Sequence, residues 1–260
     1  WSMAKSFTNA MVGILVREGK IDIYKPADIA EWKKDDRNKI TLNDLMQMQS
    51  GLKWNEDYGT KSDVTLMLHC EGDMSHYAYD MPPEYPAGTH WYYSSGTTNI
   101  VNRIIRSKFD TDSAYYSFAF KELFNKTGMP DAVFESDATG TFVGSSYLYA
   151  TARDFARFGQ LFLNDGVFNG ERILPEGWVD YSRTPASDSK GGYGSFFWLN
   201  RSKSLSSAPE DMYMCVGHDG QRIFILPSQQ MVVVVLGYSP TAKGGMDFNS
   251  LLKDILATLN

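Results

Sequence analysis

Apolar residues recur at helical spacing along much of the chain. Between residues 7 and 15 they fall on one helical face, and Gly19 follows as a terminator, which predicts a helix near the start of the chain. Thr41 and Thr151 are each followed three residues later by aspartate, the pattern of a capped helix start. Apolar positions predict further helices over residues 100–105 and 115–124.

The pattern changes near the end of the chain, where residues 212–216, 222–226 and 231–238 are predicted to form an antiparallel meander of strands. The last of these lacks alternation, which is typical of a strand covered on both faces in the middle of a sheet. A central strand needs two neighbours, so we infer that strands preceding this sequence pair on its other side. A closing helix, apolar from Phe248 to Leu259, is predicted to cover one face of the sheet.

Residues 51–92 show little periodicity and are predicted to be a long irregular stretch of the kind that often lines a binding site. Trp54, Tyr58 and Tyr85 lie in this stretch. These aromatic side chains shape a ligand pocket or only pack against one another, and the sequence leaves both interpretations open.

Composition and charge narrow the class of protein. A chain of 260 residues with a net charge of -6 can build a large core and has no basic surplus for a nucleic acid partner. The longest apolar run, residues 231–236, is too short to span a membrane. Cys70 and Cys215 build neither a disulfide framework nor a zinc site. The compartment stays open, and we favour the periplasm or cell envelope over the cytoplasm.

Three patterns could support chemistry. Ser2 and Lys5 are three residues apart, so a helix places a candidate nucleophile and its base on one face. Tyr93 lies in a polar and aromatic cluster directly before a predicted helix and could move a proton. His218 and Gly220 lie between two predicted strands, where glycine permits close backbone approach to a ligand. Taken singly, these patterns equally fit a helix cap, a packed loop and a structural histidine.

Other chemistries find less support in the sequence. A Gly-x-Ser-x-Gly elbow, a Walker A loop and a His-Glu-x-x-His pair do not occur. The four histidines show no metal-ligand spacing, so no metal site is predicted. The adjacent carboxylates Glu56 and Asp57 are interpreted as solvated loop charge.

The three patterns occur together and in order, and the chain resembles the serine beta-lactamase and penicillin-binding-protein superfamily. Within it, the chain is most similar to class C beta-lactamases, family VIII esterases and, above all, 6-aminohexanoate-dimer hydrolases. The motifs are Ser2-Met3-Ala4-Lys5, Tyr93-Ser94-Ser95-Gly96 and His218-Asp219-Gly220, the last in place of the usual Lys-Thr-Gly. Residues 41–52, 85–89 and 149–159 extend the likeness over nearly the whole chain.

The resemblance implies an α+β fold in which a helical domain lies beside an antiparallel sheet flanked by helices. The motifs divide the chain into a mainly helical domain over residues 1–185 and part of an α/β domain over residues 186–260. Members of the superfamily carry a helix and strands before the Ser-x-x-Lys helix. We expect those elements to be missing from this sequence.

The resemblance also implies roles for particular residues. Ser2 is expected to be the acylated nucleophile, Lys5 its base and Tyr93 the proton shuttle, although Tyr92 also has a serine two residues on. The backbone N–H groups of Ser2 and Gln221 are expected to form the oxyanion hole. Ser95, His218 and Gly220 are expected to contact substrate.

The expected activity is hydrolysis of small esters or amides through an acyl-enzyme. His218 and Ser95 replace the lysine and asparagine that grip a beta-lactam in class C enzymes, which favours this activity over antibiotic hydrolysis. A D-amino-acid peptidase, a beta-lactamase and a non-catalytic binding or sensor protein remain alternatives. The partner is a small molecule, no cofactor is implied, and the sequence does not determine the oligomeric state.

Overall fold

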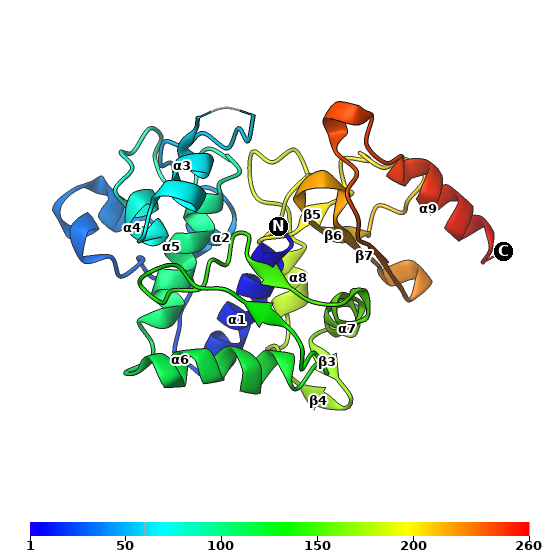
Figure 1. The fold of residues 1–260 in the computed structure, drawn as a ribbon, viewed down its shortest axis with the longest axis horizontal. Coiled ribbons are helices and arrows are strands. Elements are labelled where there is room, and N and C mark those ends of the chain that lie inside the picture. The colour runs from blue at the N-terminus through cyan, green and yellow to red at the C-terminus, as the bar shows by residue number, and fades with distance from the viewer. Residues whose placement is uncertain (60, 260) are drawn as a thin grey trace.

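The computed structural model describes residues 1–59 and 61–259 and combines helices with small antiparallel sheets (Figure 1). The helices are α1 (Ala4–Arg17), α2 (Leu42–Met46), α3 (Asp63–Cys70), α4 (Met74–Tyr79), α5 (Ser95–Arg106), α6 (Asp112–Phe118), which continues as a π-helix over Ala119–Phe124, α7 (Ala152–Leu163), α8 (Trp178–Ser182) and α9 (Phe248–Ala257). The predicted helices and the α+β class are confirmed. None of the helices described is long and apolar enough to cross a membrane.

The largest sheet in the described part of the chain has the strand order β5-β6-β7-β8, with every pair antiparallel. Its strands are β5 (Trp198–Leu199), β6 (Tyr213–Val216), β7 (Arg222–Leu226) and β8 (Met231–Val235). The predicted meander is therefore confirmed. Two short hairpins, β1 (Val133–Phe134) with β2 (Leu148–Tyr149) and β3 (Val167–Phe168) with β4 (Glu171–Arg172), complete the strands.

β8 is the last strand of this four-stranded sheet in the described part of the chain. Among the described residues it pairs with β7 alone, and each of its five residues is half-buried. That further strands pair with its open edge stays a prediction.

Helices cover both faces of the sheet. On one face Leu252 of α9 is buried with Phe224 and Leu226 of β7, as the apolar stripe of this helix predicts. On the other face α7 packs against β7 and β8, and Gly159 lies so close to Val232 that a Cβ atom there would meet it at 2.6 Å. The sheet is thus a middle layer between α7 and α9 (Figure 1).

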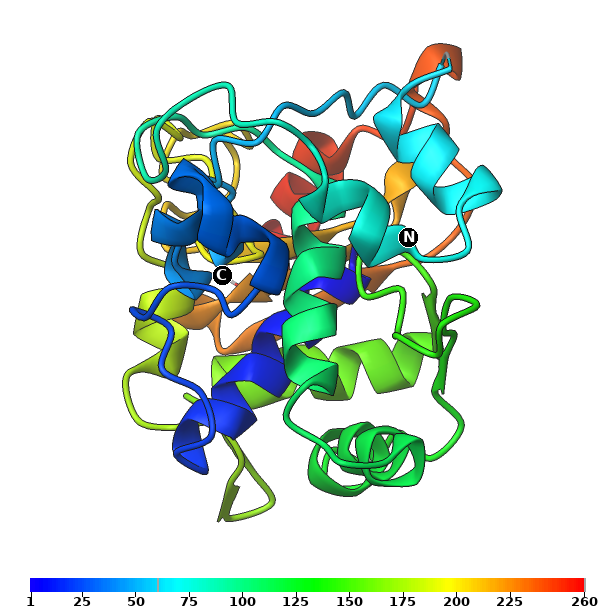
Figure 2. The ribbon, with the colours of Figure 1, turned by 90° about the vertical axis from the view of Figure 1, so that its left-hand side faces the viewer.

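α1 is the central helix of the molecule, and Figure 2 shows it passing behind α5. Residues 4–15 are all buried, including polar ones that bond to segments far away in the sequence. Ser6 donates to the Phe196 carbonyl at 2.7 Å, and Asn9 donates to the Ser195 carbonyl at 2.8 Å. Because buried polar groups require partners, these bonds fix the neighbours of α1 in place.

The prediction of an irregular stretch over residues 51–92 is wrong for two segments, which form α3 and α4. Both helices are short, so their apolar periodicity is weak. Their starts depend on side-chain bonds instead: Asp73 accepts from the His76 N–H at 2.9 Å, and Thr65 accepts from the Ser62 N–H at 3.0 Å. The remaining loops of this stretch lead to the site described below.

The proposed domain boundary at residue 185 stays a prediction. One continuous apolar core contains Phe7 of α1, Phe158 of α7 and Ile223 of β7, so buried residues on both sides of the boundary pack together. α7 in particular precedes residue 185 and packs on the sheet that follows it.

Gly13 is expected to be essential for the packing of α1. A Cβ atom at this position would meet Trp178 Nε1 at 2.6 Å, and Nε1 donates to Asn9 Oδ1 at 2.9 Å. Alanine in a helix is normally better than glycine, but here Gly13→Ala should lower the free energy of unfolding by about 1–3 kcal/mol through overpacking. Urea denaturation measures this change.

Gly72→Ala is the matched control, because a Cβ atom there would meet the Ala138 Cβ at an ordinary 3.6 Å. It should change the free energy of unfolding by less than about 0.5 kcal/mol. Equal stability of the Gly13→Ala and Gly72→Ala variants would contradict the packing argument.

Candidate active site

Lys5 joins three segments of the chain at one point. Its Nζ donates to Ser2 Oγ, to Ser95 Oγ and to the Ser145 carbonyl, each at 3.0 Å. Ser2 precedes α1, Ser95 is the first residue of α5, and Ser145 lies in the loop before β2. Two of the motifs that are 90 residues apart in sequence therefore meet at the Lys5 amine.

Burial changes the acid–base properties of Lys5. The side chain is only 1% exposed, and desolvation lowers the pKa of its amine to about 8, while the nearby carboxylate of Glu56 acts in the opposite direction. A larger fraction of the amine is then neutral at pH 7 than in a solvated lysine. The amine, unlike a solvated lysine, can accept the Ser2 hydroxyl proton.

The interpretation of Glu56 as a solvated loop charge is wrong, because its carboxylate lies at this site. Its carboxylate accepts from Ser95 Oγ at 2.5 Å, from the Ser95 N–H at 2.8 Å and from the Trp54 indole at 2.6 Å. The Ser95 N–H belongs to the first turn of α5, where a negative charge is favourable. Asp57 is exposed. A local sequence pattern could not reveal this contact because Ser95 is 39 residues away.

Tyr93 lies beside Lys5, with Lys5 Nζ 4.9 Å from the centre of its ring. Burial raises the pKa of the Tyr93 phenol well above its ordinary value, with smaller contributions from Tyr193 and Glu56, while Ser2 acts in the opposite direction. A phenol of this kind stays protonated and can donate. Tyr92 is 45% exposed and lines a separate cavity, so the geometry favours Tyr93 over Tyr92 as the neighbour of Lys5.

The third motif forms a 3₁₀ turn over His218–Gly220 between β6 and β7, beside the start of α1. The His218 ring lies 5.0 Å from the rings of Trp1 and Tyr58. Gly220 has a φ of +90°, which glycine adopts without strain, and a Cβ atom there would meet Ser239 at 2.9 Å.

Gln221 follows this turn, as expected of an oxyanion-hole residue. Its backbone N lies 3.5 Å from the His218 carbonyl oxygen, a distance at which a hydrogen bond is weak. Its side-chain amide bonds to the Gly237 carbonyl after β8. A cavity of about 440 Å³ extends from Gln221 past Met3 to residues 146–150.

Tyr58 closes over the site from the loop that follows Trp54. Its hydroxyl is buried, and burial raises the pKa of this phenol, while Ser95, Ser2 and Ser146 lower it. Of the aromatic residues singled out in the sequence, Tyr58 lies at this site and Tyr85 lines the other cavity. Trp54 bonds to Glu56 at this site and also lines the other cavity. The residues described hold no cluster of histidine, cysteine, aspartate or glutamate suited to a metal ion.

Comparison with known proteins identifies relatives of this chain. A curated relative is the 6-aminohexanoate-dimer hydrolase of Paenarthrobacter ureafaciens, 26% identical over 268 residues, which include 92% of this chain and 65% of the relative. The chain thus spans about two thirds of the length of that enzyme.

Solved structures show the same architecture. A proposed 6-aminohexanoate-dimer hydrolase from Bacillus anthracis is 26% identical, with a TM-score of 0.77 over 99% of this chain and 70% of its own. A D-stereospecific amidohydrolase from Streptomyces sp. is 14% identical, with a TM-score of 0.64 over 90% of this chain and 79% of its own. These likenesses show a beta-lactamase/transpeptidase-like fold. The beta-lactamase family pattern matches residues 1–251, and the chain therefore belongs to the beta-lactamase family.

Proposed function

We propose that this protein is a serine hydrolase that cleaves small esters or linear amides through an acyl-enzyme on Ser2. The observation that supports this most strongly is the 3.0 Å contact between Lys5 Nζ and Ser2 Oγ, combined with the burial that lowers the pKa of Lys5 to about 8. A serine hydroxyl becomes a nucleophile when an adjacent neutral base accepts its proton.

In the acylation step, neutral Lys5 accepts the Ser2 hydroxyl proton while Oγ forms a bond to the acyl carbon of the substrate. The negative charge that develops on the carbonyl oxygen is stabilised by the N–H groups of Ser2 and Gln221. When the tetrahedral intermediate collapses, the bond to the leaving alcohol or amine breaks. The proton held by Lys5 reaches that leaving group through the Tyr93 hydroxyl.

Deacylation repeats these proton transfers, with water as the nucleophile and Ser2 as the leaving group. A water molecule attacks the acyl carbon as its proton passes through Tyr93 to Lys5, and the Ser2 oxygen leaves and takes the proton back. Tyr93 acts here as a relay rather than as a phenolate base, because burial raises its pKa while that of Lys5 falls. Lys5 is therefore the base of the pair.

The third motif supports a preference for esters and linear amides. His218 occupies the place of a lysine, so the compact ammonium group with its three N–H donors is missing there. Ser95, in place of an asparagine, bonds to Lys5 and Glu56. The name of the Paenarthrobacter relative refers to a linear amide substrate, which supports the same class.

Substitution of Ser2 tests the nucleophile. Ser2→Ala in the intact protein should lower kcat for a 4-nitrophenyl ester by at least about 10⁴-fold, because no covalent intermediate can form. A fluorophosphonate should label the unsubstituted protein once, and peptide mapping should place the adduct on Ser2. The exposed Ser206→Ala is the control and should keep both properties. An adduct elsewhere, or turnover by the Ser2→Ala variant, would overturn the assignment.

The pH profile tests Lys5 as the base. A base acts when it is neutral, so kcat/KM should fall as pH drops below about 8, the pKa of Lys5, and reach a plateau above it. A solvated lysine, with a pKa near 10.4, would give a rate still rising at pH 9. Initial rates between pH 5 and 10 with a neutral ester measure the profile.

Glu56→Gln should move that profile toward lower pH, because the Glu56 carboxylate raises the pKa of Lys5 and its removal lowers it. The exposed Glu176→Gln should leave the profile in place. A Glu56→Gln variant that loses activity without any shift in pH dependence would show that Glu56 has only a structural role.

A substrate panel tests the preferred class. kcat/KM should be about 10–100-fold higher for a 4-nitrophenyl ester than for a penicillin, because a charged hydrogen bond to the penicillin carboxylate is weakened when histidine replaces lysine. His218→Lys should narrow this difference. Penicillin turnover by the unsubstituted protein at the ester rate would favour the beta-lactamase alternative instead.

A further inference from the structure

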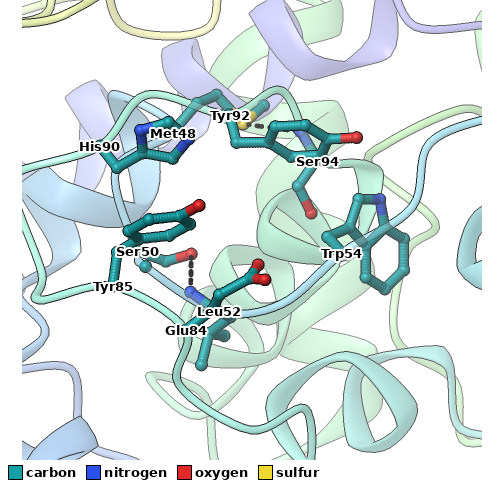
Figure 3. Close-up of a pocket in the computed structure, with 10 residues that line it drawn as sticks. Met48, Ser50, Leu52, Trp54, Glu84, Tyr85, His90, Tyr92 and Ser94 are labelled. Carbon is teal, nitrogen blue, oxygen red and sulfur yellow. Dashed lines mark hydrogen bonds between the residues drawn. The ribbon is translucent and has the colours of Figure 1, made fainter.

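A second cavity, of about 150 Å³, is lined by Ser94 of the second motif (Figure 3). Neither Ser2 nor Lys5 is among the described residues that line it. Aromatic rings form much of its wall. Trp54, Tyr85, His90 and Tyr92 surround the space, and the Glu84 carboxylate points into it between Tyr85 and Trp54. The cavity therefore combines several π faces with one negative charge.

The charges around this cavity favour a cation. None of the described residues that line it is lysine or arginine. His90 Nδ1 lies 3.2 Å from Asp188 Oδ2. The Asp188 carboxylate would therefore neutralise any positive charge on the His90 ring. The Glu84 carboxylate then gives the cavity a net negative potential, and the aromatic faces add attraction for a cation.

Main-chain bonds hold the walls in position. The N–H groups of Glu84 and Tyr85 donate to the Gly51 carbonyl at 2.8 and 3.0 Å, and the Tyr92 N–H donates to the Met48 carbonyl at 2.9 Å. Gly51 has a φ of +72°, and a Cβ atom there would meet the Tyr85 carbonyl oxygen at 2.1 Å. The two segments can approach so closely only with glycine at this position.

Stacking also orders the rings. The Tyr85 and His90 rings lie 4.1 Å apart, and Trp54 is held by its hydrogen bond to Glu56. Tyr85 and Tyr92 are each nearly half exposed, although bulky aromatic side chains gain free energy from burial. The walls are thus held open around a space that a ligand could fill.

We propose that this cavity binds a primary alkylammonium ion. Glu84 would accept hydrogen bonds from the ammonium group, the rings of Tyr85, Tyr92 and Trp54 would face the charge, and the alkyl chain would lie on Met48 and Leu52. A cavity of this volume holds a ligand about the size of benzene, which corresponds to a chain of four or five carbon atoms. This inference does not depend on the proposed function, since binding needs no turnover.

Binding of n-butylammonium chloride tests the proposal directly. NMR titration of the intact protein, with tryptophan fluorescence as a second measure, should show one saturable site. Butanol has the same number of heavy atoms without the charge and should bind at least about ten-fold more weakly. High sodium chloride should weaken n-butylammonium binding.

Substitutions identify the residues that hold the ion. Glu84→Gln should weaken n-butylammonium binding about ten-fold or more, and Tyr85→Leu about two- to five-fold. Both positions are exposed, so their substitution should leave the fold intact. The exposed Glu176→Gln, outside the cavity, should bind as the unsubstituted protein does. Absence of saturable binding, equal binding of butanol, or unchanged binding by Glu84→Gln would overturn the proposal.

Kinetics of the unsubstituted protein distinguish two sources of the ammonium group. If it belongs to the substrate, n-butylammonium should raise the apparent KM for a 4-nitrophenyl ester of 6-aminohexanoate but not for the ester of hexanoate. If the cavity serves a separate amine, the two esters should respond alike. A protein inactive toward both esters would refute the proposed function, while the titration would still decide whether the ion binds.

Discussion

The arrangement of this molecule depends on the hydrogen bonds that the buried amine of Lys5 donates. An amine removed from water must have partners, and Lys5 finds them in Ser2, Ser95 and the Ser145 carbonyl, which come from three different segments. The packing of α1 against α5 and the loop before β2 therefore serves both stability and chemistry. Any shift of α5 that separated Ser95 from Lys5 would leave a buried donor unpaired.

The same burial determines how the charges of the site are balanced. Desolvation lowers the pKa of Lys5 to about 8, whereas the Glu56 carboxylate limits the decrease. Glu56 is itself held by Ser95 and by the Trp54 indole, and it lies at the start of α5, where a negative charge is favourable. A loop carboxylate thus raises the pKa of an amine with which it makes no direct hydrogen bond, and Ser95 bonds to both.

Local patterns in the sequence predicted most of the fold. The Thr41 and Thr151 capping boxes form as expected because their bonds lie within one helical turn. The predictions that failed concern segments with weak local periodicity or contacts between residues far apart in the chain. α3 and α4 are too short to show a clear apolar period, and the Glu56 carboxylate bonds to Ser95, 39 residues away. The spacing of residues along the chain is visible in one sequence, but contacts between distant residues are not.

The segment from Tyr92 to Ser95 shows how one stretch can serve two sites. Its backbone is not helical before Ser95, and Ser94 has an extended conformation with a φ of -145°. Successive side chains of an extended backbone point to opposite sides. Tyr92 and Ser94 accordingly line the aromatic cavity, while Tyr93 and Ser95 lie beside Lys5. This alternation supports the proposal of Tyr93 over Tyr92, because Tyr93 shares a side with Ser95 and lies next to the Lys5 amine.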